Sequence, residues 1–470
     1  MKKEFGYADL HCHPNLKTFG HSFDKGRPGD KQNVWHYKPP SFFGKLLNIM
    51  TGITRFSQSD FTTLSRGGAK IIFASLYPFE KGFFINSAGK GPLSAWLSDK
   101  ITDIGYRRVR ELQSHTNYFK DLEKEYHFFI DSQKTNQIGG REYRWKLAAN
   151  NSDVQKSLNA EDEVAVIMTI EGAHVFNAGL GDYGRPSSET EIIANIRNVK
   201  QWAYPPLFIT FAHNFNNDLC GHAHSLEPLK NLVDQSKGLN EGFTELGRKV
   251  LHELLSIENG RAVFIDIKHM SFKSRQEYFN ILSNAYKDRI PPTIVSHGAV
   301  NGLSLKQKPS NNSTSGFYET DINFFNEEIA HIGKSGGLFA IQFDTRRIAN
   351  KKLVKKHVRS LFNDRDIVKS AELIWNQIQH IAEVLDSNEI YAWGTACIGS
   401  DYDGTIDPLP GVWTAEYFSA LYKEVLKIAS RFLKSTNTLS LPENKSITAE
   451  EVCDRFFLDN TKQFLERFYQ

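Results

Sequence analysis

The stretch VAVIMTIEGAH (164–174) places a mostly apolar run directly before Glu171. Apolar and β-branched runs of this length, bounded by turn residues, are typical of strands that are buried on both faces of a parallel sheet. Seven further runs have the same form: FGYADLHCH (5–13), AKIIFASLY (69–77), PLFITFAHN (206–214), AVFIDIKHMS (262–271), PTIVSHG (292–298), GGLFAIQFD (336–344) and WGTACIGSDYDG (393–404). The sequence therefore predicts eight parallel strands.

Helical patterns lie between these runs. Segments 240–257 and 367–386 carry apolar residues three and four positions apart. Strands that alternate with helices indicate βα units, and eight such units favour a closed (β/α)8 TIM barrel of the α/β class over an open sheet. Thr448 and Glu451 have capping-box spacing, which predicts a C-terminal helix.

We expect one domain, a metal-dependent hydrolase barrel over residues 1–470, with long insertions at about 14–57 and 78–160 after the first and second strands. Barrel enzymes build their sites at the carboxyl ends of the strands, so these insertions could wall a pocket. They could equally be solvated decoration or an oligomer contact, which leaves a homodimer open.

Composition excludes several classes of protein. The 470 residues are 40% hydrophobic, and 57 basic against 54 acidic side chains give a formal charge of +3, so we expect no nucleic-acid partner. No apolar run approaches the roughly 18 residues of a membrane span, so we expect no membrane partner. Four distant cysteines and a start without an apolar segment argue against a secreted disulfide scaffold and indicate a cytoplasmic protein.

His11 and His13 end the first predicted strand. Positions i and i+2 of a strand share a face, so both imidazoles point the same way and Cys12 points the opposite way. The spacing alone means little, because His222 and His224 repeat it by chance. Two imidazoles on one face at a strand end can hold a divalent cation.

Other strands end in residues of the same chemical kind. Glu171, His213, His269, His297 and Asp401 follow the third, fourth, fifth, sixth and eighth runs. Each one alone is better explained by a structural role, but together they require a common cause. A metal site supplies it, because functional residues in a barrel come from the ends of several strands.

Imidazoles with a carboxylate suit Zn²⁺ better than Mg²⁺ or Ca²⁺. The surplus of ligands indicates two zinc ions bridged by Glu171, which would activate a water for attack on an amide carbonyl. Asp401 is then free to take the proton of that water. His213, if it is not a ligand, can stabilise the oxyanion.

These motifs resemble the renal (membrane) dipeptidase family of the amidohydrolase superfamily. The resemblance runs in order along almost the entire chain and lies in HCH (11–13), IEGAH (170–174), FAHNFNN (211–217), DIKH (266–269), VSHG (295–298) and IGSDYDGT (398–405). It implies a (β/α)8 barrel with two zinc ions that hydrolyses dipeptides and some related amides.

The resemblance also implies roles for individual residues. His11 and His13 match the ligands of one metal, Glu171 the bridging glutamate, and His269 and His297 the ligands of the other metal. In the same way, His213 matches the contact to the substrate carbonyl oxygen, and Asp401 matches the catalytic aspartate.

Three departures from the family pattern bear on the substrate. The first motif is HxH where HxD is usual, and Lys268 replaces a serine. Strand alternation predicts that Lys268 points away from the barrel, so we do not expect a carbamylated metal bridge. The arginine that grips a dipeptide carboxylate is missing after the sixth strand, where Lys306, Lys308 or Arg346 could substitute.

The sequence therefore predicts a dipeptidase-like amidohydrolase that cuts a small peptide or an N-acyl amino acid. Two alternatives stay open. The first is an amidohydrolase that opens a cyclic amide or ester, and the second is a non-catalytic barrel that binds metal.

Overall fold

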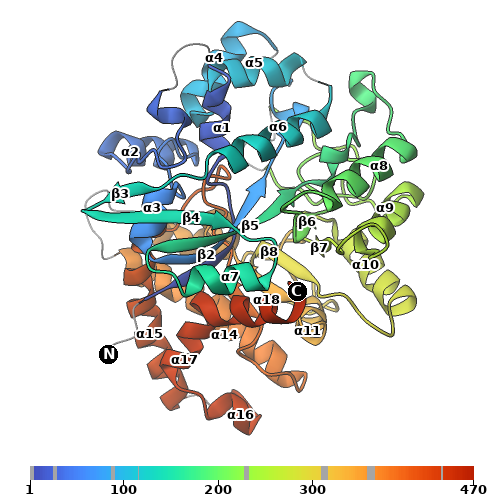
Figure 1. Cartoon of the computed structure of the whole chain (residues 1–470). Coiled ribbons are helices and arrows are strands. Elements are labelled where there is room, and N and C mark those ends of the chain that lie inside the picture. Colours follow the sequence, from blue (N-terminus) through green and yellow to red (C-terminus); the bar gives the residue numbers. More distant parts are fainter. Residues whose placement is uncertain are drawn as a thin grey trace.

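A computed structural model describes residues 5–24, 29–85, 90–114, 116–226, 232–308, 316–356, 366–435 and 438–470. All eight predicted runs form strands of one parallel sheet, in the order β1-β2-β5-β6-β7-β8-β9-β10. Their bounds are β1 Tyr7–Cys12, β2 Ala69–Leu76, β5 Glu163–Glu171, β6 Phe208–Thr210, β7 Phe264–Asp266, β8 Ile294–Gly298, β9 Leu338–Ile341 and β10 Ala396–Ile398. Figure 1 shows this sheet at the centre of the molecule with helices around it.

The sheet closes between its first and last strands. The backbone N–H of Asp401 donates to the His11 carbonyl at 2.9 Å, and the N–H of His13 donates to the Tyr402 carbonyl at 2.9 Å. Cys12 and Tyr402 form a parallel bridge at the same place. The predicted TIM barrel is therefore confirmed, and the seam of the barrel passes directly beside the predicted metal ligands.

The outer helices follow the predicted pattern. Segment 240–257 contains α9 Glu245–Leu255, and segment 367–386 coincides with α14 Asp366–Ser387. The other helices of the outer layer are α3 Phe61–Gly67, α8 Glu189–Lys200, α10 Phe272–Ala285, α11 Asn326–Lys334, α12 Thr345–Ile348, α13 Lys351–Lys356, α15 Phe418–Ser435 and α16 Pro442–Lys445.

The C-terminal helix begins where its cap predicts. Thr448 caps α17 Ala449–Asp454, and the Glu451 side chain accepts in return from the Thr448 N–H at 2.9 Å. A π-helical turn, η7 Arg455–Asp459, leads into α18 Asn460–Phe468. None of the described helices has the length and apolar character that crossing a bilayer requires.

Most of the two insertions lies above the carboxyl ends of the strands, whereas the helix at 151–158 lies beside the C-terminal helix (Figure 1). The first holds α1 Leu16–Ser22, η1 Asp30–Gln32 and α2 Phe42–Thr51; the second holds η2 Lys81–Phe83, α4 Pro92–Thr102, α5 Tyr106–Ser114, α6 Tyr118–Asp131 and α7 Asn151–Leu158. The second also contains a hairpin, β3 Asn136–Ile138 and β4 Arg141–Leu147, that the sequence analysis does not predict. β4 pairs in parallel with β5 and so extends the central sheet.

Candidate metal centre

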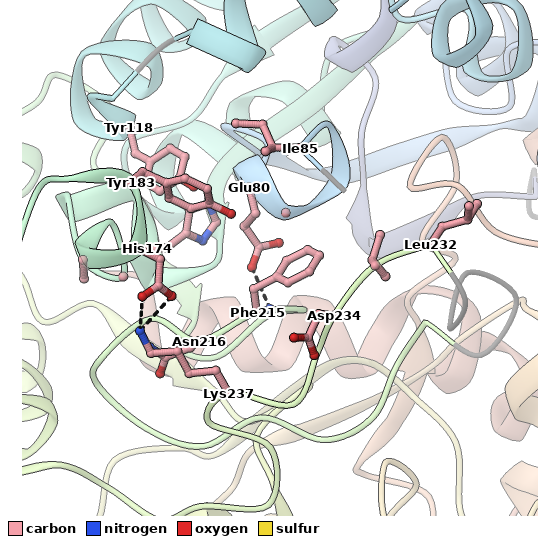
Figure 2. A pocket seen from close by; sticks show the side chains of 15 residues that line it. Glu80, Ile85, Tyr118, His174, Tyr183, Phe215, Asn216, Leu232, Asp234 and Lys237 are labelled. Atoms are coloured by element: carbon pink, nitrogen blue, oxygen red, sulfur yellow. Dashed lines mark hydrogen bonds and ion pairs between the residues drawn. The ribbon is translucent and has the colours of Figure 1, made fainter. Parts of the chain in front are cut away.

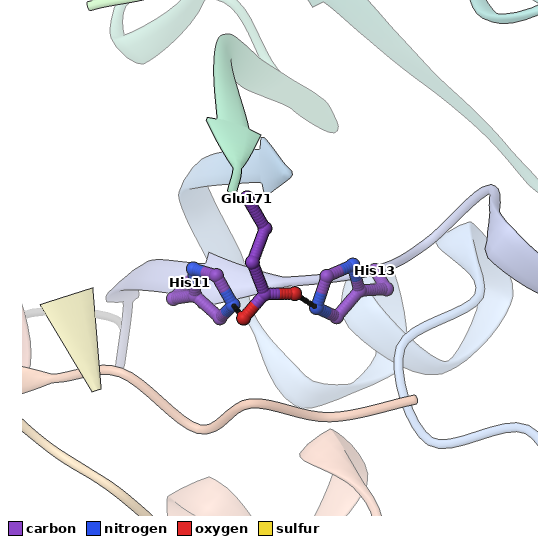
Figure 3. Close-up of side chains that lie close together, drawn as sticks. All are labelled: His11, His13 and Glu171. Carbon is purple, nitrogen blue, oxygen red and sulfur yellow. Dashed lines mark ion pairs between the residues drawn. The ribbon is translucent and has the colours of Figure 1, made fainter. Parts of the chain in front are cut away.

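His11, His13 and Glu171 converge at the carboxyl ends of β1 and β5 (Figure 3). Nε2 of His11 lies 3.4 Å from Oε1 of Glu171, and Nε2 of His13 lies 3.2 Å from Oε2. All three side chains are buried. The two imidazoles therefore share one face of β1, as strand alternation predicts, and each faces a different oxygen of the same carboxylate.

Three further imidazoles surround this carboxylate. Nε2 of His213 lies 3.4 Å from Oε1 of Glu171, and Nε2 of His297 lies 3.7 Å from the same oxygen. Nε2 of His269 lies 3.2 Å from Nε2 of His297. The potential ligand atoms fall into three sets, each within 4.8 Å: His11, His13 and Glu171; His11, His297 and Asp401; Glu171, His213 and His269.

Asp401 completes the cluster from the end of β10. Its Oδ1 lies 3.8 Å from Nε2 of His11 and 3.7 Å from Nε2 of His13. The Gln342 side-chain amide donates to its Oδ2 at 2.7 Å. Burial, followed by the charge of Glu171, raises the pKa of Asp401 to about 8. The structure thus brings together all seven side chains that the sequence analysis proposes.

The outer nitrogens of two of these imidazoles are held by the protein. Nδ1 of His13 lies 3.1 Å from the Ser75 carbonyl, and Nδ1 of His297 lies 2.8 Å from the Ser296 hydroxyl. The Ser296 hydroxyl donates in turn to Asp266 at 2.6 Å. Such partners fix a histidine so that its other nitrogen is presented to a metal ion.

The inner nitrogens, in contrast, face one another. Nε2 of His11 and Nε2 of His13 are buried, point towards Glu171 and have no hydrogen-bond partner among the described residues. Buried imidazoles that face each other and a carboxylate are costly unless a cation lies between them. His222, from the chance HxH repeat, shows the opposite pattern, because its two nitrogens lie 3.1 and 3.0 Å from backbone carbonyls. The donors of the cluster fit one or more first-row divalent ions.

The backbone around the cluster adopts an uncommon conformation. His269, Asp401 and Asp403 have φ angles of 65°, 59° and 66°, in the left-handed region that side chains other than glycine rarely enter. β7 ends at Asp266, so the turn that follows re-aims His269 towards His297. Left-handed residues of this kind cluster at functional sites because the site requires the direction that they give to a side chain.

The prediction that Lys268 points away from the barrel is wrong, because this residue lies in the same turn. Lys268 is buried and lines the cavity of the metal centre, with its Nζ 3.4 Å from the Gln342 side-chain oxygen. Alternation does not apply to it because the strand has already ended at Asp266. Burial, followed by the nearby Arg347, lowers the pKa of Lys268 to about 7.

Glu80 also belongs to the site, although it was not among the site residues predicted from the sequence. Oε2 of Glu80 lies 2.6 Å from Nδ1 of His213 and also accepts from the Tyr77 hydroxyl at 3.1 Å. Oε1 accepts from the Phe215 N–H at 3.0 Å. Burial opposes the charge of the imidazole, but Glu80 and then Glu171 raise the pKa of His213 to about 10. The available signal was a carboxylate just after the second strand, three residues past Tyr77.

Glu80 also forms part of a second, neighbouring cavity of about 600 Å³ (Figure 2). His174, Tyr118 and Tyr183 surround that cavity together with Glu80. The residue Glu80 is only 4% exposed. Glu80 therefore lies between the two cavities, and its carboxylate oxygens are hydrogen-bonded to His213, Tyr77 and Phe215.

The cavity of the metal centre has a volume of about 290 Å³ and is bounded by both insertions. Thr51 and Ile53 contribute from the first insertion, and Ile101 and Thr102 contribute from α4 of the second. The predicted role of the insertions as pocket walls is thus what the structure shows. One side of the cavity is apolar, with Tyr77, Phe79, Phe83, Phe84 and Ile104.

The candidate cations for a substrate carboxylate differ in position. Arg346 and Arg347 both line the cavity, whereas Lys306 and Lys308 are exposed and lie outside its lining. The Nε of Arg346 donates to both oxygens of Asp344 at 2.9 Å, so this guanidinium is already engaged by a carboxylate. Arg347 is 8% exposed and donates to the Ser225 carbonyl.

Comparisons with known proteins agree with this geometry at the level of the fold. No protein-family model matches the sequence, and no curated protein matches it. The chain is similar to the solved structure of dipeptidase AC, a metallopeptidase of family M19, with 13% identity and a TM-score of 0.55 over 99% of each chain. It is also similar to a metallopeptidase from Rhodobacter sphaeroides, solved with a phosphinate mimic of the dipeptide L-Ala-D-Ala, with 13% identity and a TM-score of 0.53 over 99% of this chain and 100% of that one. The fold that the resemblance to the renal dipeptidase family implies is therefore confirmed for the part of the chain that the structure describes.

Proposed function

We propose that the chain is a metal-dependent, dipeptidase-like amidohydrolase of the renal dipeptidase family. The observation that supports this best is the convergence of seven chemically capable side chains from six strand ends, with inner nitrogens that face one another around Glu171. His11 and His13 with Glu171 would hold one zinc ion, and His269 and His297 with Glu171 would hold the second.

Bound zinc ions lower the pKa of water and polarise an amide carbonyl. The protein contributes the other parts of the chemistry. Asp401 accepts the proton of the attacking water and passes it to the leaving amine, and Gln342 holds its other oxygen in place. His213, kept charged by Glu80, donates from Nε2 to the oxygen that gains negative charge.

The lining of the cavity favours a substrate with an apolar group beside a carboxylate. The aromatic wall of Tyr77, Phe79 and Phe84 accepts an apolar side chain or acyl group. Lys268 and Arg347 on the other side offer positive charge to a carboxylate. We therefore propose a small peptide or an N-acyl amino acid as the substrate, with Arg347 in place of the missing family arginine.

Elemental analysis should find about two zinc-like ions per chain. His269→Ala should lower this content because it removes one ligand and leaves the His297 nitrogen unmatched. His222→Ala is the matched control, because this buried imidazole binds only backbone carbonyls and should leave the metal content unchanged. Activity of a metal-free protein without added ions would contradict the mechanism, and unchanged content in the His269 variant would contradict that assignment.

Glu80→Gln should lower kcat by roughly 10–100-fold and change KM little, because the neutral amide no longer holds a charge on His213. Gln keeps an oxygen for the Phe215 N–H, so the fold should be preserved. In a His213→Ala background the same change should have no further effect, since the two side chains act as one unit. An equal loss in both backgrounds would show that Glu80 acts independently of His213.

The two alternative functions are separated by a substrate screen. L,L-, L,D- and N-acyl dipeptides, cyclic amides and esters would be offered to the zinc-loaded protein. Turnover of linear amides supports the proposal, and turnover of cyclic substrates alone would favour the ring-opening chemistry. A fully loaded protein that turns over none of them would indicate a non-catalytic metal-binding barrel.

A further inference from the structure

The helices α2 and α4 of the insertions expose an unusual amount of apolar surface. Of the fifteen large apolar side chains that are exposed among the described residues, five belong to α2 and four to α4. Scattered single apolar residues on a surface need no explanation, but a contiguous group marks a site of interaction. Figure 1 shows both helices on the same side of the barrel, away from the C-terminal helices.

The helix α2 carries its apolar stripe on the outside. Phe42, Phe43, Leu46, Ile49 and Met50 recur at helical spacing and are all exposed, Phe43 to 78% and Met50 to 76%. A surface helix of a globular protein normally turns such a stripe towards the core. Among the residues of α2, only Asn48 is buried.

The helix α4 repeats this inverted arrangement. Leu93, Trp96, Leu97 and Ile101 are exposed along one face, Leu93 to 71%. Its buried residue is the small Ala95. The two helices therefore present two apolar stripes to the outside, which we call the α2–α4 surface.

Basic side chains from the segments on either side of α2 form ion pairs with a carboxylate at the end of α4. Asp103, the C-terminal cap of α4, lies 3.1 Å from Nζ of Lys31 and 3.7 Å from a guanidinium nitrogen of Arg55, and it also pairs with Lys38. Asp103 is 7% exposed as a side chain, whereas the three cations are 33–51% exposed. Residues 31–59 contain no Asp or Glu at all. Lys31, Lys38 and Arg55 therefore outnumber the single carboxylate of Asp103, and this group carries a net positive charge.

We propose that the α2–α4 surface docks onto an anionic lipid bilayer. Helices that lie in a bilayer interface combine an outward apolar face rich in Phe, Leu and Trp with basic side chains that meet anionic headgroups. The expectation of no membrane partner arose from the lack of a spanning segment, and interfacial docking needs only one apolar face. Because Thr51 and Ile101 also line the cavity of the metal centre, docking brings the wall of that cavity against the lipid.

A second copy of the chain is a poorer occupant of this surface. A symmetric dimer pairs the surface with a second copy of itself, so one positively charged region would meet another. Like charges brought together across an interface are unfavourable. Anionic headgroups, in contrast, complement both the apolar stripes and the cations.

Co-sedimentation of the full chain with lipid vesicles tests the proposal. Vesicles of phosphatidylcholine with phosphatidylserine should bind the chain more tightly than vesicles of phosphatidylcholine alone, and added salt should weaken the binding. The triple variant Phe43→Ser, Met50→Ser and Leu93→Ser should lower the partition coefficient by about 100-fold, because three apolar side chains no longer enter the interface. Ile257→Ser is the matched control, since Ile257 is 75% exposed and lies outside the insertions.

Three results would overturn the proposal. The first is a lack of binding to either kind of vesicle by the wild-type chain, and the second is equal binding by the triple variant. The third is an equal loss of binding in Ile257→Ser. Sedimentation equilibrium measures the oligomeric state. If the wild-type chain is a dimer, the triple variant is a monomer and neither binds vesicles, the surface belongs to a second copy and lipid docking is refuted.

Discussion

Asp401→Asn is expected to lower kcat by roughly 10²–10⁴-fold while the metal content of the protein stays the same. Asparagine keeps the shape of the side chain and tolerates the left-handed backbone at φ 59°, so the fold should be retained. It can neither accept the proton of the attacking water nor return it to the leaving group. Steady-state kinetics and elemental analysis of the same preparation check both parts of this result.

Asp234→Asn is the matched control for this experiment. Asp234 lies in the neighbouring cavity and is exposed, with its carboxylate bound to the Ser236 N–H. The control variant should turn over substrate as the wild type does. Full activity of Asp401→Asn would remove Asp401 from the proton-transfer role, and loss of metal in that variant would make it a ligand instead.

Arg275→Met should be the most destabilising single substitution proposed for this chain, costing about 3–5 kcal/mol of unfolding free energy. Arg275 and Glu328 are each 1% exposed, and Nε of Arg275 donates to Glu328 at 2.7 Å. Removal of the guanidinium leaves a buried carboxylate without its cation. A second guanidinium nitrogen donates to the Met270 carbonyl at 3.0 Å, so the residue next to His269 also loses its support.

The unfolding midpoint in urea measures the loss of stability. The affinity for metal ions measures the effect of the lost hydrogen bond to Met270 on the neighbouring His269. Arg275→Met with Glu328→Met should recover part of the stability, because no unpaired charge remains. Arg248→Met is the matched control: its pair with Glu277 is 44% and 26% exposed, so the loss should be about 1 kcal/mol or less. An equal loss in Arg248→Met and Arg275→Met would show that burial of the pair is not the cause.

The barrel could be predicted because buried parallel strands leave a continuous apolar run in the sequence. β5 is buried along its whole length, and its run was recognised without any other information. β4, with the sequence REYRWKL, is mostly exposed or half-buried and reads as polar, so its pairing with β5 depends on contacts that the sequence does not display. The outward stripe of α2 was missed for a related reason, because periodicity reveals that a face is apolar but not which way it points.

In the site, the residues at regular strand ends could be predicted from the sequence, whereas those in turns and those brought together by the closed barrel could not. His11 and Glu171 lie on strands and His13 directly follows β1, so alternation gives the direction of each side chain. Lys268 follows the end of β7, where the left-handed turn at His269 breaks that rule. Glu80 is remote from His213 in sequence, and only the closed barrel brings the two within 2.6 Å.

The left-handed backbone at His269 and Asp401 has a consequence for how this chain can diverge. A residue other than glycine in this region costs on the order of 1 kcal/mol or more, and only the role of its side chain offsets that cost. A descendant that no longer needs the chemistry would gain stability by drifting to glycine at both positions. We therefore expect a distant homologue that keeps both His and Asp at these positions to retain the metal centre, even where the rest of its sequence has changed.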